Sequence, residues 1–227
     1  MNPKNIKCLD GATWPTSAAI LIQDVIQKTL LGRGSCNVML TGGRSAEQLY
    51  LAWAALADFQ NLCDVQFYFG DERCVLPEHP DSNYGLVMRT LFNRGLPDGC
   101  AIFRMEAGRS EYDAAAAAYE QQLPNKLDVL LLSVGEDGHI ASLFPNGDAL
   151  YETKRQVVSV SAPKPPHERL TVTPPVLAQA ENIFVLAIGV AKAAILQQAQ
   201  LAPQEIANLP ARLVLNSTWL LDTPLQN

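Results

Sequence analysis

Apolar runs alternate with helical patterns along this sequence, and this alternation constrains the fold more than any other feature. The runs occur at 37–40, 65–69, 129–134 and 183–188, and amphipathic segments lie before, between and after them. An apolar run without polar alternation is typical of a strand that is buried on both faces. The sequence therefore predicts a parallel sheet that helices cover on both sides.

Helical spacing of apolar residues predicts the covering helices. The first is expected at 17–31, with Thr16 or Ser17 as its N-cap. Further helices are expected at about 82–93, 110–122 and 190–198 and around Leu49, Trp53 and Leu56, and a short strand is expected at 212–215. No linker or composition break divides the chain, so we expect a single doubly wound, Rossmann-like α/β domain over residues 1–227.

Composition excludes several classes of protein. Hydrophobic residues make up 48% and charged residues 18% of the 227, which rules out a disordered, collagen-like or coiled-coil chain. The net charge is −6 and no Lys/Arg-rich tract is present, so neither a nucleic acid nor a membrane is an expected partner. Any anionic ligand must be held locally.

Cysteine usage and the apolar stretches indicate the compartment. The five cysteines are an odd number without a Cys-x-x-Cys pair, so we expect reduced thiols. Residues 1–15 lack the apolar stretch of a signal peptide. The most apolar stretch, 183–196, is too short for a bilayer span and contains Lys192. A cytoplasmic location is expected.

In a doubly wound sheet the ligand lies beyond the carboxyl ends of the strands. This rule selects the loops at 41–45, 71–83, 135–145 and 189–192.

The first of these loops, 41–45, is suited to an anion. Gly42 and Gly43 let backbone N–H groups approach a phosphate at the start of a helix. The loop matches neither the Walker pattern nor G-x-G-x-x-G, so a nucleotide is not implied. A tight turn with Ser45 as N-cap is the alternative.

The second loop places Asp71, Glu72 and Arg73 directly after a strand. Charges at such a position cost free energy unless they pair with one another or serve a site. Farther along the loop, we expect Asp81 or Ser82 to cap the next helix.

The third loop, 135–145, is the most informative. His139 follows the most apolar strand, precedes an expected helix start and has Asp137 two residues away. An imidazole oriented by a carboxylate can act as a general base near neutral pH, and a structural histidine is the alternative. No third ligand for a metal is evident, so we expect neither a metal nor a cofactor.

The fourth region adds two cations. Arg169 follows a pair of prolines and could clamp a phosphate through bidentate hydrogen bonds. Lys192 interrupts an apolar helix start, where it either binds an anion or extends to the surface.

Together these segments resemble the 6-phosphogluconolactonase family, within the group that includes glucosamine-6-phosphate isomerases and deaminases. The motifs occur in the same order from the first loop almost to the C-terminus. They are Thr41-Gly42-Gly43, Asp71-Glu72-Arg73 with 79–84, Gly135-Glu136-Asp137-Gly138-His139-Ile140-Ala141-Ser142-Leu143-Phe144-Pro145, Arg169-Leu170-Thr171, and Gly189-x-x-Lys192.

The resemblance implies an open α/β sheet and a metal-free hydrolase of 6-phospho-D-glucono-1,5-lactone in the oxidative pentose phosphate pathway. His139 resembles the base that activates water, with Asp137 beside it, and Arg73 resembles the arginine that stabilises developing negative charge or positions the lactone. The expected substrate- and phosphate-binding residues are Thr41, Gly42, Gly43, Arg44, Asp71, Asn83, Arg169 and Lys192.

The chemistry agrees with these roles. A δ-lactone is an activated ester, so its hydrolysis needs only a base, donors for the oxyanion and an anchor. No covalent nucleophile is required, and neither Cys74 nor Ser142 lies in a nucleophile-elbow pattern.

Two departures bear on the alternatives. The related deaminases resemble this chain but carry a glutamate five residues after the histidine, where this sequence has Phe144, so an isomerase or deaminase is disfavoured. Arg44 replaces a small residue, and it either adds to the anchor or points to solvent. A non-catalytic sugar-phosphate-binding module is a third possibility, but the short segment before Ser17 leaves no room for a DNA-binding element. We expect a monomer or a weak homodimer.

Overall fold

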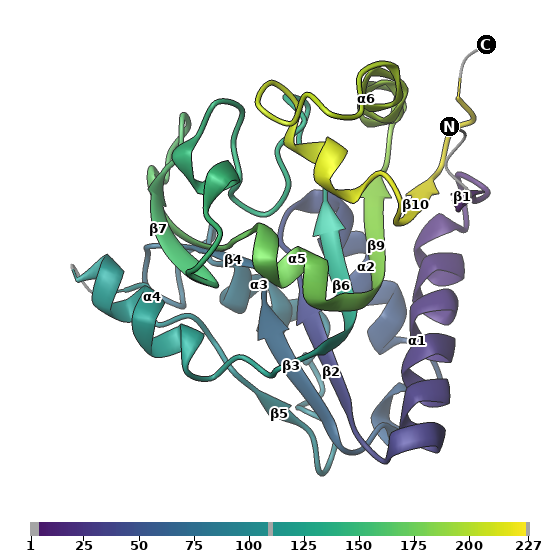
Figure 1. Cartoon of the computed structure of the whole chain (residues 1–227). Coiled ribbons are helices and arrows are strands. Elements are labelled where there is room, and N and C mark those ends of the chain that lie inside the picture. The colour runs from purple at the N-terminus through teal and green to yellow at the C-terminus, as the bar shows by residue number, and fades with distance from the viewer. Residues whose placement is uncertain (1–4, 109–110, 226–227) are drawn as a thin grey trace.

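The computed structural model describes residues 5–108 and 111–225, and its centre is a seven-stranded sheet (Figure 1). Every neighbouring pair of strands is parallel, in the order β1-β10-β9-β6-β2-β3-β5. The predicted α/β sheet is confirmed. Its strands are β1 (Ile6–Cys8), β2 (Cys36–Leu40), β3 (Val65–Phe69), β5 (Ala101–Ile102), β6 (Leu127–Ser133), β9 (Ala180–Ala187) and β10 (Thr218–Leu221).

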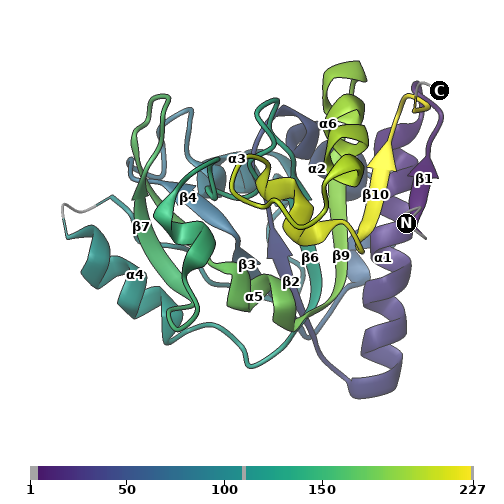
Figure 2. The same ribbon diagram turned by 45° about the horizontal axis from the view of Figure 1, so that its top comes forward.

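Helices cover both faces of this sheet (Figures 1 and 2). Successive residues of β6 divide between two cores, with Leu130 in one and Leu131 in the other, as expected for a strand buried on both faces. One core is closed by α1 (Trp14–Arg33), α2 (Arg44–Ala54), α3 (Asn83–Thr90) and η1 (Phe59–Asn61). The other is closed by α4 (Tyr112–Glu120), α5 (Pro174–Gln179), α6 (Val190–Leu201), η2 (Asp148–Tyr151) and η3 (Pro210–Val214).

A second, antiparallel sheet was not predicted. It has the order β4-β8-β7 and consists of β4 (Asp71–Arg73), β7 (Val157–Ser161) and β8 (Glu168–Val172). The charged β4 segment has little strand propensity of its own, and its pairing with β8 imposes the extended conformation. The pairing sets Arg73 directly opposite Arg169.

The strand order reverses between β2 and β6. From β2 the chain continues outward to β3 and β5, whereas β6 is followed by β9 and β10 on the other side. The loops that leave the adjacent carboxyl ends of β2 and β6 meet, and Ser133 donates from its backbone N–H to Thr41 Oγ1 (3.2 Å) and from its hydroxyl to the Gly42 carbonyl (3.0 Å). A ligand is expected at such a reversal.

The expected strand at 212–215 is wrong. Residues 210–214 form the 3₁₀ helix η3, and the last strand is β10, a few residues later. Pro210 suits the first turn of a helix, and the short apolar run that follows it has no periodicity that distinguishes a strand from a helix.

The expected start of the first helix is also wrong, and so is the alternative in which Ser45 caps the second. Helix α1 begins at Trp14 with Thr13 as N-cap, because Pro15 is accommodated in its first turn. Helix α2 begins at Arg44 with Gly43 as N-cap, so Ser45 lies inside the helix. The expected cap at Ser82 is confirmed, since its hydroxyl accepts a hydrogen bond from Gly85 N–H (3.0 Å).

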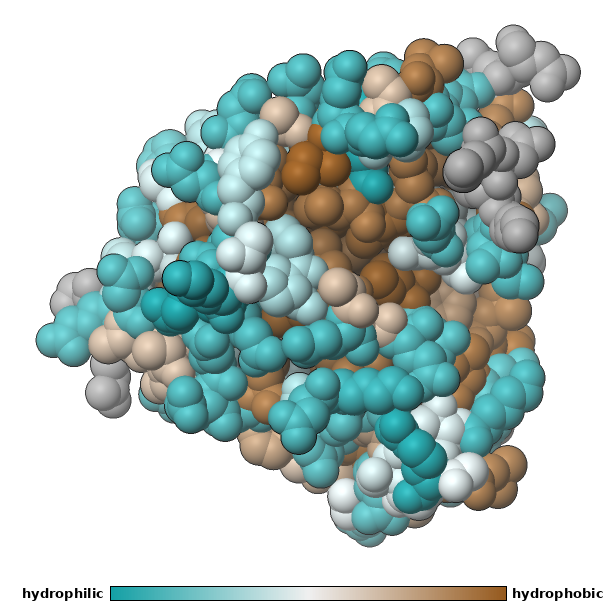
Figure 3. All heavy atoms as spheres, in the orientation of Figure 1, coloured by the Kyte–Doolittle hydropathy of each residue, from teal (hydrophilic) through white to brown (hydrophobic). Residues whose placement is uncertain are grey.

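Apart from a helix start expected after His139, the other expected strands and helices are present within a few residues of their expected bounds, with residue 110 outside the described part. Figure 3 shows apolar atoms gathered near the middle of the face seen in Figure 1, with polar atoms around them. No helix within residues 5–108 and 111–225 is long and apolar enough to cross a membrane. That the chain forms one domain over 1–227 stays a prediction.

Candidate active site

Loops from several strand ends converge on a cavity of about 140 Å³ at the reversal point of the sheet. Strand β4, its partner β8 and the first turn of α6 complete the wall. Among the predicted site residues, the cavity brings together Thr41, Gly42, Gly43, Asp71, Arg73, His139, Arg169 and Lys192. Asp137, Asn83 and Arg44 do not line it.

Asp137 lies behind His139 and orients its ring. The Nδ1 atom of His139 is 2.5 Å from Asp137 Oδ1, and this bond holds the pKa of the Asp137 carboxyl down at about 2. A carboxylate that is ionised at neutral pH can only accept, so the imidazole proton resides on Nδ1. In the neutral imidazole this tautomer leaves the lone pair on Nε2, as a general base requires.

Glycine at 135 is required for this geometry. A Cβ atom there would lie 2.1 Å from His139 Nδ1, so the ring packs where a side chain would be. The expected helix start after His139 is wrong. Ile140 forms isolated bridges with Val134 and Leu143, and Ala141 has φ of +49°, which no α-helix contains.

Arg73 and Arg169 supply positive charge from paired strands. Arg73 Nη1 donates to the Asp81 carbonyl (2.8 Å), and its buried Nε has no hydrogen-bond partner among the described residues. Arg169 is 7% exposed, and its Nε donates to the Pro166 carbonyl (3.1 Å). Burial, reinforced by the charge of Arg73, lowers the pKa of Arg169. An anion between these side chains would relieve their repulsion.

Two helix N-termini also lead to the cavity. Gly43 and Gly189 are the N-caps of α2 and α6, with φ of +94° and +93°, a region that favours glycine. Gly42 is needed for close packing, because a Cβ atom there would lie 1.9 Å from Asn83 Oδ1. Backbone N–H groups and helix dipoles at this place favour a phosphate.

Lys192 lies in the first turn of α6 and lines the cavity. Burial lowers its pKa, the charge of Arg44 lowers it further, and Glu136 acts in the opposite direction. Arg44 is exposed, yet it is near enough to repel Lys192. Its position is compatible with a role at the entrance of the site.

A buried hydrogen-bond network supports the cavity from behind. Asp71, 5% exposed, accepts from Ser142 Oγ (2.7 Å) and from Asn83 Nδ2 (3.0 Å). Ser142 N–H donates to Thr171 Oγ1 (3.0 Å), which ties the His139 loop to β8. Asn83 thus holds Asp71 and packs against the phosphate loop rather than facing the cavity.

Glu72 points away from the cavity and caps α3. Its carboxylate accepts from the N–H groups of Arg73 (2.8 Å), Asn83 (2.7 Å) and Tyr84 (2.7 Å) and from Ser82 Oγ (3.1 Å). Burial raises its pKa, and the backbone bonds act in the opposite direction. Of the three charged residues that follow β3, Asp71 and Arg73 therefore line the cavity, whereas Glu72 caps a helix.

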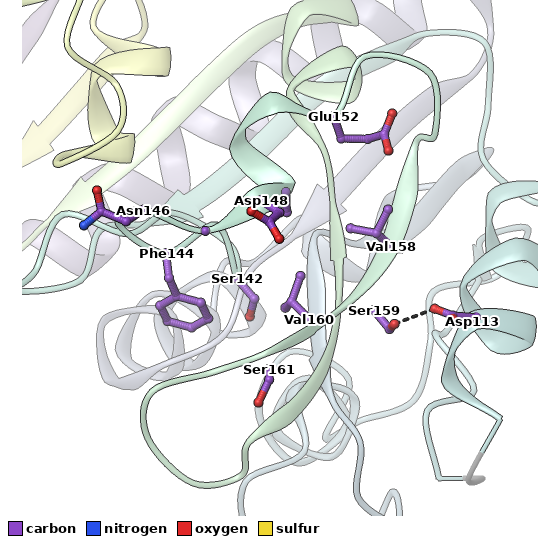
Figure 4. A pocket seen from close by; sticks show the side chains of 12 residues that line it. Asp113, Ser142, Phe144, Asn146, Asp148, Glu152, Val158, Ser159, Val160 and Ser161 are labelled. Atoms are coloured by element: carbon purple, nitrogen blue, oxygen red, sulfur yellow. Dashed lines mark hydrogen bonds between the residues drawn. The ribbon is translucent and has the colours of Figure 1, made fainter.

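Ser142 and Phe144 are among the residues that line a larger cavity of about 600 Å³ (Figure 4). The carboxylates of Asp113, Asp148 and Glu152 line it, and Asp113 accepts from Ser159 Oγ (2.5 Å). No arginine or lysine is among its lining residues. The charge of this cavity disfavours a phosphate, so the smaller cavity is the candidate active site.

Sequence reasoning missed Ser133, Ala141 and the structural role of Ser142. The first two line the cavity, and the third anchors its histidine loop. Ser133 is the last residue of an apolar strand, and its polarity was the signal that could have identified it. The Asp71–Ser142 bond spans 71 positions, and no local pattern encodes it.

Several known proteins resemble this chain in sequence and in fold. Residues 10–221 match the family described as glucosamine-6-phosphate isomerases/6-phosphogluconolactonase. The chain is 34% identical to a 6-phosphogluconolactonase of Streptomyces coelicolor, over 91% of this chain and 87% of the relative. It is 33% identical to that of Mycobacterium tuberculosis, over 87% and 86%. A crystal structure of a 6-phosphogluconolactonase from Shewanella baltica shares the fold, with a TM-score of 0.84, 23% identity and 98% of both chains covered.

Proposed function

The chain belongs to the family of glucosamine-6-phosphate isomerases and 6-phosphogluconolactonases, and on that basis we propose how its site performs lactone hydrolysis. Its activity is that of its curated relatives, the hydrolysis of 6-phosphogluconolactone to 6-phosphogluconate. The proposal rests on one observation. A carboxylate-oriented histidine shares a cavity with the cations Arg73, Arg169 and Lys192.

His139 acts as the general base in this proposal. Its Nε2 takes a proton from water as the water oxygen bonds to the lactone carbonyl carbon. The imidazolium that forms is stabilised by the Asp137 carboxylate. When the tetrahedral intermediate collapses, the bond from the carbonyl carbon to the ring oxygen breaks. The proton held by His139 is then available to that leaving oxygen.

Cations and backbone donors supply the remaining functions. Arg73, which lines the cavity together with His139, is placed to stabilise the oxyanion. Arg169, Lys192 and the backbone N–H groups of Gly42 and Gly43 form the phosphate anchor, which uses binding energy to hold the lactone against the histidine. Asp71 holds the wall of the cavity in place, and Arg44 adds positive charge at the entrance of the cavity.

The test is His139→Ala, assayed by coupled detection of 6-phosphogluconate above the spontaneous background. We expect kcat to fall about 100-fold or more, because the water loses its base. His79→Ala is the matched control, since His79 also has an aspartate two residues away, with 3.7 Å between Nδ1 and Asp81 Oδ2, but lies outside the cavity. An unchanged kcat in His139→Ala would remove His139 from the mechanism.

The same assay tests the expectation that no metal participates. Activity should be unchanged by a chelator, and its loss would overturn the metal-free mechanism. Release of ammonia from glucosamine 6-phosphate would instead favour the deaminase alternative, against which stands Phe144, whose ring contacts His139 at 4.9 Å between centroids. A cytoplasmic location, a place in the pentose phosphate pathway and a monomeric or weakly dimeric state are further predictions.

A further inference from the structure

A buried tyrosine hydroxyl holds both backbone groups of the residue that begins the phosphate loop. Tyr50 OH donates to the Thr41 carbonyl (2.7 Å) and accepts from the Thr41 N–H (2.9 Å). Tyr50 is 0% exposed, and burial raises the pKa of its phenol, so it remains a neutral donor and acceptor. One side chain therefore satisfies two backbone groups that the sheet does not pair.

The need for this contact arises where β2 ends. The last ladder contact on one side is Gly70 N–H to the Leu40 carbonyl (3.0 Å). On the other side, Ser133 N–H reaches the Thr41 side chain rather than its backbone. Without Tyr50, the buried N–H and C=O of Thr41 would lack partners, a condition that drives a loop to rearrange.

We propose that Tyr50 is a positioning residue for the phosphate anchor. Tyr50 lies on α2, whose N-terminus is one wall of the anchor, so its hydroxyl locks that helix to the loop that precedes it. Thr41 Oγ1 accepts from Ser133 N–H, and within residues 5–108 and 111–225 its own proton has no acceptor. That proton is directed to the ligand only while the Thr41 backbone is held in place.

A second tyrosine provides a matched control. Tyr119 on α4 is 1% exposed and makes the same pair of bonds at the end of β3, accepting from Phe69 N–H (2.7 Å) and donating to its carbonyl (3.1 Å). Phe69 does not line the cavity. Asp71, two residues later, is fixed independently by Ser142 and Asn83. Tyr119 thus repeats the hydrogen-bonding geometry without the phosphate loop.

The inference rests on the proposed function, and its test separates the two. Tyr50→Phe, Tyr119→Phe and the unchanged protein are compared for lactone kcat and KM, for Tm, and for the Kd of inorganic phosphate in a calorimetric titration. We expect Tyr50→Phe to raise KM and the phosphate Kd about 10-fold with kcat within about 2-fold, since anchoring contributes to ground state and transition state alike. The two variants should lower Tm by similar amounts, because each loses the same pair of hydrogen bonds. Tyr119→Phe should leave KM and the phosphate Kd within about 2-fold of the unchanged protein.

Unchanged KM and phosphate Kd in Tyr50→Phe, or equal changes in the two variants, would overturn the proposal. If the unchanged protein binds phosphate without hydrolysing the lactone, the proposed function fails. The phosphate Kd values still test whether Tyr50 positions the phosphate anchor. If Tyr50→Phe does not fold, amide NMR of the unchanged protein tests the proposal instead. Phosphate should shift the Thr41 resonance and leave that of Phe69 in place, and a Thr41 resonance that does not respond refutes the assignment.

Discussion

His139 receives its orientation from the Asp137 carboxylate and its space from Gly135. Both partners lie within four residues of it in sequence, so this part of the site is local chemistry. At the scale of single residues, the sequence motif therefore encodes almost all of the geometry that we propose for the base. The positions of the surrounding cations are not encoded by a local motif, because the residues next to them come from other strands.

Asp137 gives a prediction for stability against pH. Its folded-state pKa is about 2, below the value near 3.9 of an unfolded aspartate. Its carboxylate therefore stabilises the fold fully above about pH 5, and this contribution is lost as the pH falls through about 2. Urea unfolding should show Asp137→Asn to be less stable than the unchanged protein at pH 6, by a gap that falls to about half at pH 3.

The gap at pH 6 should be modest, because the Asp137 side chain is 46% exposed and solvent screens its interaction. A gap that widens between pH 5 and pH 3 would contradict the assigned direction of the pKa shift.

At the scale of elements, α3 depends on a carboxylate that lies outside it in sequence. Glu72 on β4 satisfies the first N–H groups of α3, a function that capping rules assign to residues next to the helix. Ser82, the local cap, was predictable from its position before the helix. Glu72 was not, because β4 is extended only through its pairing with β8.

Replacing this distant cap should destabilise the protein. Glu72→Ala leaves the buried N–H of Asn83 and the half-buried N–H of Tyr84 without acceptors, which should cost about 3 kcal/mol of the free energy of unfolding. Denaturant unfolding measures the loss. Glu78→Ala, an exposed glutamate of the same loop, should change stability by less than about 0.5 kcal/mol. Equal effects in the two variants would refute the cap.

At the scale of the whole molecule, a chain of net charge −6 assembles a positive cavity. It does so because Arg73, Arg169 and Lys192 come from β4, β8 and α6 and meet only where the strand order reverses. Burial, together with neighbouring positive charge, lowers the pKa of Arg169 and Lys192, and an anion in the cavity would offset that charge.

Lys192→Met should therefore raise the KM for the lactone about 10-fold or more and change kcat little, with a weaker dependence of KM on salt. Steady-state kinetics at low and high ionic strength provide the measurement. Lys126→Met is the control, because Lys126 pairs with Glu181 (2.6 Å) outside the cavity and should leave KM unchanged. A KM that does not respond to Lys192→Met would exclude this lysine from the anchor.

The sequence by itself determined the parallel sheet, the order of most elements and the segments that contain the site. Continuous apolar runs such as 129–134 can satisfy burial only between two helical layers, and glycines and charges after strands indicate loops that face a ligand. These features are local in the chain, so one sequence reveals them.

The tertiary structure alone decided the second sheet, the cap that Glu72 provides and the clamp of Tyr50 on Thr41. It also turned 210–214 into a 3₁₀ helix where a strand was expected. The charged β4 segment, for example, has a weak preference of its own, and its partner β8, distant in sequence, determines its conformation. Hydrogen bonds such as Ser142 to Asp71 depend on where strands come together, which periodicity does not encode.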